Sequence, residues 1–265
     1  MSARKTAPAK KKGAAKPVNS GKSTVYDESK IKTLSSLEHI RLRSGMYIGR
    51  LGDGSNHDDG VYVLLKEVID NSVDEFIMGE GSRINVSIGD DKKISVRDFG
   101  RGIPLGKVIE CVSVINTGAK YNDDVFQFSV GLNGVGTKAV NALSSWFRVV
   151  SYRDGSYMEA VFSRGNLKSE KKGKISGKKN GTLVEFLPDT EIFDEYEYNY
   201  EFIEQRLWNY AYLNKGLTLY LGNQKFKSDN GLKDLLLDEV GDDTIYDIGY
   251  HDTKQIEFAF THTGF

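Results

Sequence analysis

The sequence is poor in several features whose scarcity narrows its class. It contains a single cysteine, Cys111, in 265 residues, which excludes a disulfide framework and indicates a cytosolic setting. No apolar run approaches the length that a membrane-spanning helix requires, and no hydrophobic segment of the signal-peptide kind is present. We therefore expect a soluble globular protein of the cytoplasm that has no membrane partner.

Acidic residues are missing from the first 22 positions, which read MSARKTAPAKKKGAAKPVNSGK. Lysines and an arginine dominate there, and no large apolar residue except Val18 is present, so this stretch cannot bury enough surface to fold. We expect residues 1–22 to form a disordered basic tail on a body that is net acidic. Such a tail either contacts DNA or another polyanion, or it is only a solubilising leader.

The rest of the sequence alternates helical and strand-like periodicities. Apolar residues at helical spacing predict helices at 35–42, 61–77, 105–115, 137–143 and 202–211. Period-two alternation around turn residues predicts hairpins of 84–88 with 94–98 and 147–152 with 157–162, and strands at 182–186, 217–221 and the IEFAF segment. The Lys- and Gly-rich stretch Lys168–Asn180 is predicted to be a loop. Because hairpins outnumber parallel crossovers, we expect an α+β fold with helices packed on one face of a mixed, mostly antiparallel sheet.

A glycine-rich stretch, GLNGVG at residues 131–136, precedes the helix predicted at 137–143. It is close to a P-loop, but a P-loop places lysine before the hydroxyl residue, whereas Thr137 precedes Lys138 here. It also matches a dinucleotide fingerprint with Asp154 about 20 residues on, although Asp154 falls in a hairpin turn. A structural helix cap is the third interpretation. In each case, glycine N–H groups at a helix N-terminus can hold an anion.

The helix predicted at 61–77 has a polar face opposite its apolar stripe. Glu67 and Asn71 lie one turn apart on that face. A polar face of this kind is usually just solvated, and that interpretation stands beside a functional one. The residues of the face are Glu67, Asp70, Asn71, Asp74 and Glu75.

One carboxylate falls where an apolar side chain is expected. Asp98 shares the face of Ile94 and Val96 in the predicted strand, and burying it without partners costs free energy or raises its pKa. The turn at residues 99–104 follows, with glycines that allow the close approach of a flat ligand. An inward acceptor beside such a turn suits an exocyclic amino group such as that of adenine; the alternative is a turn that Asp98 caps.

Together, three motifs resemble the Bergerat ATP-binding fold of the GHKL superfamily, which includes type IIA topoisomerase B subunits, Hsp90, MutL and sensor histidine kinases. The motifs are E-x-x-x-N on a helix, D-x-G-x-G after a strand and G-x-x-G-x-G before a helix. The segments VYDE, RLRSGMYIG and NTGAKYND resemble the N-terminal half of bacterial gyrase and topoisomerase IV B subunits, from about Tyr26 onward. GLNGVGTKAVNALS and RDFGRGIPLGKV are more similar to topoisomerase IV than to gyrase.

This resemblance implies that ATP and Mg²⁺ are the cofactors. Glu67 would be the general base that orients the attacking water, and Asn71 would hold Mg²⁺ through its amide oxygen. Asp98 would accept a hydrogen bond from the adenine amino group, and Thr182 would bond the same ordered water. These four residues would carry the chemistry and the base recognition.

The resemblance also assigns a pocket rim, a lid and an arm. Glu75 and Arg101 would pair across the mouth of the pocket, and Lys120 would add a positive charge to the phosphate lid. Tyr26 and Ile31 would lie in an arm that closes over the nucleotide of a partner subunit. The further ATP-binding residues that it implies are Gly100, Gly102, Ile103, Pro104, Gly131, Leu132, Asn133, Gly134, Val135 and Gly136.

Three positions depart from the pattern of the family. Ser44 stands where proline is usual, which would loosen that turn. Phe126 replaces a tyrosine that can bond the adenine ring, so that contact should be absent, and Asn133 replaces a histidine found in many gyrase lids.

Domains and partners follow from the same resemblance. Residues 23–230 would be the GHKL domain with its dimerisation arm, and residues 231–265 would begin a transducer domain. The partners would be a topoisomerase A-type subunit, DNA and, on ATP binding, a second copy of the chain, all near the nucleoid. Because the lysine that senses the γ-phosphate comes from the transducer, this chain would bind ATP but hydrolyse it slowly or not at all.

The sequence is also compatible with other functions. A GHKL ATPase of the MutL or Hsp90 type would keep the ATP site and have no topoisomerase role. A DNA-binding module led by the basic tail is a further alternative. A histidine kinase fits worst, because no phosphoacceptor histidine domain precedes the site.

Overall fold

The structure, a computed structural model, describes residues 33–117, 134–241, 243–253 and 255–264. Several predictions therefore lie outside the described residues: the tail over 1–22, Tyr26, Ile31, Lys120, Phe126, Gly131, Leu132 and Asn133. Within the described ranges, none of the helices combines the length and the apolar character that a bilayer span demands.

The described helices and strands follow the predicted order closely. The helices are α1 (Ser36–Leu42), α2 (Gly45–Ile48), α3 (Gly60–Ile77), the 3-10 turn η2 (Leu105–Lys107), α4 (Val108–Ser113), α5 (Gly136–Ala142), α6 (Thr190–Phe193), α7 (Tyr200–Leu213) and α8 (Leu232–Val240). The strands are β1 (Arg83–Ile88), β2 (Ile94–Asp98), β3 (Ser144–Arg153), β4 (Ser156–Ser163), β5 (Asn166–Lys174), β6 (Gly181–Pro188), β7 (Thr218–Leu221), β8 (Gln224–Phe226), β9 (Gly249–Asp252) and β10 (Glu257–Phe260).

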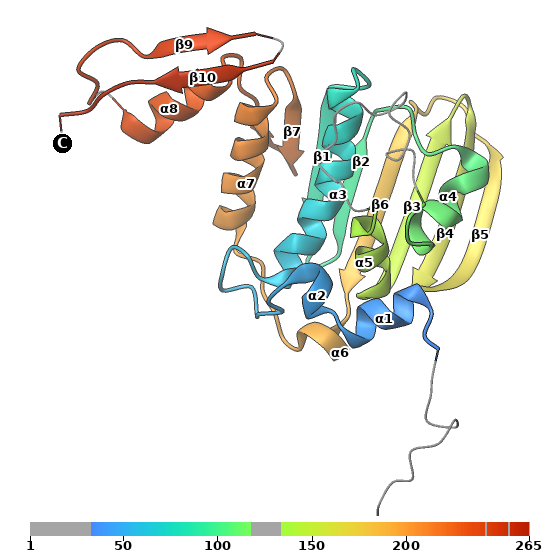
Figure 1. The fold of residues 1–265 in the computed structure, drawn as a ribbon. Helices are drawn as coiled ribbons and strands as arrows, with labels where there is room; N and C mark the ends of the chain where they lie inside the picture. Colours follow the sequence, from blue (N-terminus) through green and yellow to red (C-terminus); the bar gives the residue numbers. More distant parts are fainter. Residues whose placement is uncertain (1–32, 118–133, 242, 254, 265) are drawn as a thin grey trace, which may run out of the picture. The chain divides into compact units, whose positions relative to one another are not determined.

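Eight of these strands form one sheet in the order β5-β4-β3-β6-β2-β1-β7-β8 (Figure 1). Every neighbouring pair in it is antiparallel except β1 with β7. β9 and β10 form a separate two-stranded antiparallel sheet beside α8. The mixed, mostly antiparallel sheet of the prediction is therefore confirmed.

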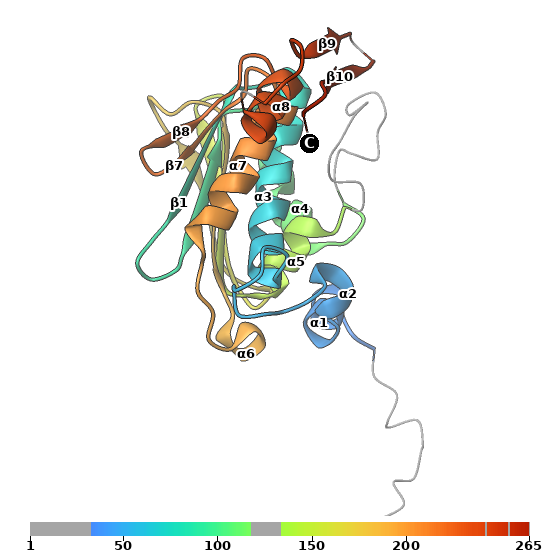
Figure 2. The ribbon, with the colours of Figure 1, turned by 90° about the vertical axis from the view of Figure 1, so that its left-hand side faces the viewer.

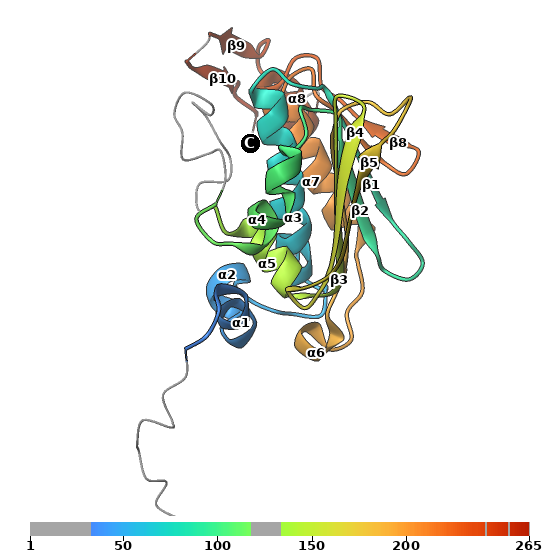
Figure 3. The same cartoon turned by 90° about the vertical axis from the view of Figure 1, so that its right-hand side faces the viewer.

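The helices α3, α4, α5 and α7 cover one face of the large sheet, as the two edge-on views show (Figures 2 and 3). The inward-facing residues of the strands, such as Val86, Val96 and Phe186, are fully or almost fully buried beneath them. This single hydrophobic layer is where the fold gains most of its stability, since burial of apolar surface is the dominant favourable term in folding. The predicted α+β architecture follows from it.

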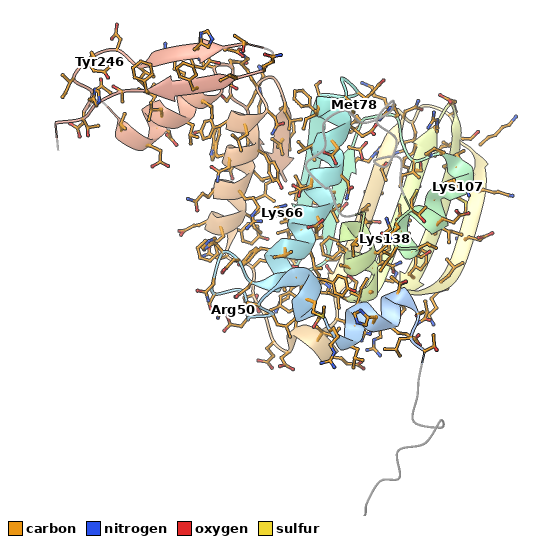
Figure 4. All side chains as sticks on the ribbon, viewed as in Figure 1. Arg50, Lys66, Met78, Lys107, Lys138 and Tyr246 are labelled. Atoms are coloured by element: carbon orange, nitrogen blue, oxygen red, sulfur yellow. The ribbon has the colours of Figure 1, made fainter. Side chains whose placement is uncertain are left out.

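The central helix α3 has partners on several sides. Its apolar stripe, including Val61, Val68 and Ile69, is buried against the sheet. The interpretation of its opposite face as solvated is wrong for Asp70 and Asp74, which are each 1% exposed. Asp70 accepts hydrogen bonds from Tyr210 of α7 and from Lys66, and Figure 4 shows Lys66 on α3 on the side facing α7.

The prediction of a loop over 168–180 is wrong for its first half. Residues 166–174 form β5, which pairs with β4 along its whole length and is the outer edge of the sheet. Lysine and glycine have low strand propensity, but lysines are also the residues that protect an exposed sheet edge from pairing with another chain. The position of the strand at the edge therefore explains its composition.

Smaller differences concern the helices. The helix predicted at 105–115 begins as the 3-10 turn η2 and ends at Ser113. The helices α2, α6 and α8 and the strands β8 and β9 were not predicted. Ser44 is the N-cap of α2 and has helical backbone angles, a conformation that a proline at this position could also adopt. The predicted strand in IEFAF is β10.

Candidate functional site

Asp98 ends β2 with its carboxylate turned toward the helices, as the alternation predicts, and it is 5% exposed. Its Oδ1 accepts hydrogen bonds from the backbone N–H of Gly100 at 2.9 Å and of Thr182 at 3.0 Å. Burial raises the pKa of Asp98 to about 6, while these two N–H groups and the Arg97 charge oppose the rise. The hydrogen bonds of the carboxylate among described residues are confined to Oδ1, so Oδ2 is left to accept from a ligand.

The turn after Asp98 presents backbone rather than side chains. A β-carbon at Gly100 would come 2.7 Å from Glu75, and one at Gly102 would come 2.7 Å from the carbonyl of Tyr152. Gly102 also has a φ of +77°, which a side chain would strain. Ser151 then donates to the carbonyl of Ile103 at 2.6 Å, and Pro104 leads into η2. The turn is therefore pressed against β3 and held there.

Glu75 of α3 fixes this turn from the helix side. Its Oε2 accepts from the backbone N–H of Arg101 at 2.9 Å and from Arg101 Nε at 3.1 Å, while Oε1 accepts from Nη2 at 2.9 Å. These bonds raise the pKa of Arg101. The predicted pair is thus in contact, in the bidentate geometry that gives arginine–carboxylate pairs their strength.

One and two turns earlier on α3, Asn71 and Glu67 meet the first residues of α5. A β-carbon at Gly136 would overlap Glu67 Oε2, so the carboxylate lies against the start of that helix. Asn71 Nδ2 donates to Thr137 Oγ1 at 2.9 Å and to the carbonyl of Glu67 at 2.6 Å. The predicted catalytic pair and the end of the glycine motif are therefore in one place.

One face of α3 thus connects two groups of predicted residues. Three side chains of α3 are spaced four residues apart, which places them along the same side of the helix: Glu67, Asn71 and Glu75. The first two touch α5, and Glu75 holds the turn that follows Asp98. Glu67 and Glu75 are about 12 Å apart along the helix axis. This distance separates the end of the site at α5, which suits phosphates, from the end at Asp98, which suits a nucleobase.

The structure excludes two other interpretations of the glycine motif. A P-loop and a dinucleotide fingerprint each require a parallel βαβ unit, but β3, the strand after α5, pairs antiparallel with both its neighbours. Lys138 donates to the carbonyl of Thr117 at 2.7 Å and is 5% exposed, and Asp154 lies in the β3–β4 turn with a φ of +51°. Within the motif, Gly134 has a φ of +58° and Val135 is the N-cap of α5.

Two cations near this site were given no role in it from the sequence. Lys138 is buried in α5 (Figure 4), and its place beside Thr137 in the glycine motif was the only available signal. Arg97 lies on the other face of the sheet, where it donates to the carbonyl of Lys179, and the alternation gave no reason to expect a functional residue there. Tyr26, Lys120, Gly131, Leu132 and Asn133 fall in ranges that the structure does not describe.

A family model described as "Histidine kinase-, DNA gyrase B-, and HSP90-like ATPase" matches residues 56–191. The chain is 65% identical over 239 residues to the B subunit of DNA topoisomerase 4 from Borreliella burgdorferi, covering 90% of this chain and 40% of that protein. It is 38% identical over 256 residues to the corresponding protein of Bacillus subtilis (89% and 38%). It is 36% identical over 228 residues to the B subunit of DNA gyrase from Clostridium acetobutylicum (81% and 35%).

A solved structure gives the same relationship. The 43K ATPase domain of Thermus thermophilus gyrase B, crystallised with an aminocoumarin, aligns with a TM-score of 0.70 at 30% identity, covering 87% of this chain and 63% of that one. The chain therefore spans less than half the length of the curated relatives it matches and about two thirds of the solved domain.

Proposed function

Because this chain belongs to the family of histidine kinase-, DNA gyrase B- and HSP90-like ATPases, we propose that it is the ATP-binding and ATP-hydrolysing module of a type IIA DNA topoisomerase B subunit. The 65% identity to a topoisomerase 4 protein favours topoisomerase IV over gyrase. The observation that carries the ATP assignment is the buried Asp98 carboxylate, whose Oδ1 is held by two backbone N–H groups while Oδ2 remains to accept from a base.

At the base end of the site, Asp98 accepts a hydrogen bond from the adenine amino group. Thr182 contributes its backbone N–H to the same carboxylate, and it would also bond an ordered water that the adenine contacts. The residues at 99–104 form one wall, in which Gly100 leaves room for Glu75 and Gly102 leaves room for β3 to pack against the turn. Ile103 and Pro104 complete this wall, and the Glu75–Arg101 pair holds the rim.

At the phosphate end, Glu67 is the general base for the attacking water. Its carboxylate lies at the N-terminus of α5, where backbone N–H groups and the helix dipole favour negative charge. Gly134, Val135 and Gly136 continue a lid that includes Gly131, Leu132 and Asn133, and Lys120 adds a point charge to it. The lid wraps the phosphates that Glu67 faces.

The residues present suit Mg²⁺, which prefers oxygen ligands and is usually held by one or two protein groups together with substrate phosphates. Asn71 would hold the ion through its amide oxygen. The Asn71 amide nitrogen is oriented by Thr137 and by the carbonyl of Glu67. When bound, the ion neutralises charge that develops on the phosphates.

The role of the whole protein extends this assignment. ATP binding brings two copies together through the arm that contains Tyr26, and this dimerisation gates the passage of DNA held with an A-type subunit. Residues 23–230 form the ATP-binding domain, and residues 231–265 begin a second domain, which the separate β9–β10 sheet supports. Because the whole protein would act on DNA, we also expect it to lie near the nucleoid.

Calorimetric titration with AMP-PNP and Mg²⁺ tests the ATP assignment. Asp98→Asn should abolish binding, and Glu67→Ala should leave binding intact. In the full-length protein, Glu67→Ala should lower phosphate release from ATP by about 10²–10⁴. The reverse pattern would overturn the two roles. Decatenation and supercoiling assays of the full-length protein with its A-type subunit then decide the biological role. ATP binding without either activity would favour a MutL- or Hsp90-like ATPase instead.

A further inference from the structure

Arg97 lies directly behind Asp98, on the face of the sheet that none of the described helices covers (Figures 2 and 3). Successive residues of a strand point to opposite faces, so Asp98 faces the helices and Arg97 faces away from them. Its guanidinium carbon lies 4.9 Å from the ring centre of Phe99 and 4.8 Å from that of Tyr152. Two aromatic faces thus hold the guanidinium in place by cation–π attraction.

The guanidinium is also hydrogen-bonded to three backbone carbonyls. Arg97 Nη1 donates to the carbonyl of Asp98, and Nη2 donates to those of Lys179 at 2.8 Å and Asn180 at 3.2 Å. Only arginine has a planar fork of donors that can reach several acceptors in this way. Arg97 therefore ties the end of β2 to the residues that lead into β6.

The residues that lead into β6 are followed directly by one of the two that hold the Asp98 carboxylate. Thr182, two positions after Asn180, donates its backbone N–H to Asp98 Oδ1 at 3.0 Å. Between them, Gly181 has a φ of +125°, and a β-carbon there would come 2.6 Å from Arg97 Nη1 and 2.8 Å from Asp98 Oδ1. A shift of the Arg97 side chain would thus be transmitted through Gly181 to both partners of that hydrogen bond.

We propose that Arg97 is a positioning residue for purine specificity, holding Asp98 and Thr182 in register from the opposite face of the sheet. This inference rests on the proposed function, in which Asp98 accepts from the adenine amino group. Adenine presents an amino donor at the position where guanine presents a carbonyl acceptor. A correctly held carboxylate attracts the first and repels the second, whereas a displaced one distinguishes them less well.

Arg97 also acts on Asp98 through its charge. The groups that act on the pKa of this carboxyl are the N–H groups of Gly100 and Thr182 and the Arg97 cation, which lower it, and Glu75, which raises it together with burial. Removing the cation therefore raises the pKa of Asp98. Because the ionised carboxylate is the better acceptor, the pH below which ATP affinity falls should then move upward.

The test compares Arg97→Gln and Arg97→Lys with Arg83→Gln as the matched control. Arg83 lies on the same face and stacks on Tyr220 at 4.5 Å and Phe99 at 5.7 Å. Its one hydrogen bond among described side chains is to Asn85, so it makes none to residues 179–182. All proteins are titrated with Mg-ATP and Mg-GTP across pH 5–8, and their melting temperatures are recorded.

Arg97→Gln should lower ATP affinity about tenfold, the loss of one charge-assisted hydrogen bond, with a smaller change for GTP, so that the ATP/GTP affinity ratio falls. The pH midpoint of ATP binding should rise. Arg97→Lys keeps the charge but not the fork, so it should lower the ratio and leave the midpoint near that of the wild type. Arg83→Gln should change neither quantity.

An unchanged ratio in both Arg97 variants would overturn the positioning role. If ATP and GTP affinity fall equally and the melting temperature falls with them, the positioning role is also overturned and Arg97 has only a structural role. If Arg97→Gln does not fold, the ATP/GTP affinity ratio of Arg97→Lys decides whether Arg97 has the positioning role. If the wild-type protein binds neither ATP nor GTP, the proposed ATP site itself is overturned. If the wild-type protein binds ATP but the Arg97 variants keep its ATP/GTP affinity ratio, only the role of Arg97 is overturned.

Discussion

Glu67 lies against Gly136 so closely that a β-carbon at position 136 would overlap the Oε2 atom of its carboxylate. Gly136 is the first residue of α5, and its backbone is helical rather than left-handed. Its lack of a side chain is therefore required by the space that Glu67 occupies and not by backbone strain. The glycine motif and the acid on α3 are thus parts of one site.

Gly136→Ala should leave the fold intact and impair catalysis. The colliding group is the end of a flexible side chain, so Glu67 would move aside, and alanine is favoured over glycine in a helix by up to about 1 kcal/mol. With Glu67 displaced, phosphate release by the full-length protein should fall by about 10²-fold or more, within the range of general-base contributions. Gly106→Ala is the control, because nothing lies within 4 Å of a β-carbon there. An active Gly136→Ala variant would argue against Glu67 as the base.

Asp98→Asn should stabilise the ligand-free protein while it removes ATP binding. Burial raises the pKa of Asp98 from 3.8 to about 6, so keeping the group ionised at neutral pH costs roughly 3 kcal/mol. An amide of the same shape avoids that cost and can still accept the two N–H bonds, so unfolding should require about 1–3 kcal/mol more. Denaturant unfolding at pH 7 measures this. If Asp98 only caps a turn, the variant should instead be less stable.

The same pKa predicts how stability depends on pH. The folded protein binds the Asp98 proton more tightly than the unfolded chain, so this contribution to stability is fully present below pH 4 and is lost as pH rises through about 6. The wild-type protein should therefore lose stability relative to Asp98→Asn between about pH 4 and 6. Parallel stability curves for the two proteins would contradict this assignment.

ATP affinity should show the opposite dependence. Binding needs the ionised carboxylate, so affinity should be constant above about pH 7 and should fall toward tenfold per pH unit below about 6. Titration of Mg-ATP into wild-type protein at several pH values measures the midpoint. The phosphates of ATP also titrate in this range, so inorganic tripolyphosphate serves as the control ligand. An identical pH profile for both ligands would remove Asp98 as the cause.

Glu75→Gln should destabilise the protein by about 1–3 kcal/mol, because a partly buried charge-assisted pair loses its charge and Arg101 loses acceptors. Its three bonds hold the turn beside Asp98, so ATP affinity should fall as well. The control is Glu110→Gln, which breaks the exposed pair with Lys107 and should cost less than about 1 kcal/mol. Equal losses in both variants would show that the Glu75 pair has no special role.

The elements that the sequence predicted correctly are those specified by local periodicity. The apolar stripe of α3 and the alternation in β1 and β2 show, from a few neighbouring residues, which side chains face the core. The inward direction of Asp98 could therefore be inferred. β5 was missed because its lysines reflect its place at the sheet edge, and the order of strands in the sheet is a property of the whole fold.

Contacts between distant segments could not be inferred from local patterns. Asp70 is buried because Tyr210, 140 positions later, donates to it, and nothing near Asp70 in the sequence indicates that partner. Arg97 follows the outward register, and its role depends on carbonyls more than 80 positions away. The juxtaposition of Glu67 with Gly136 likewise comes from the packing of α3 on α5; the sequence suggested it only through the resemblance to GHKL proteins.

The most direct test of the ATP site is a crystal structure of the chain with AMP-PNP and Mg²⁺. We expect the adenine amino group within hydrogen-bond distance of Asp98 Oδ2, the ion on Asn71 and the terminal phosphate beside Glu67. A nucleotide bound elsewhere, or bound at this site with its base away from Asp98, would contradict the assignment.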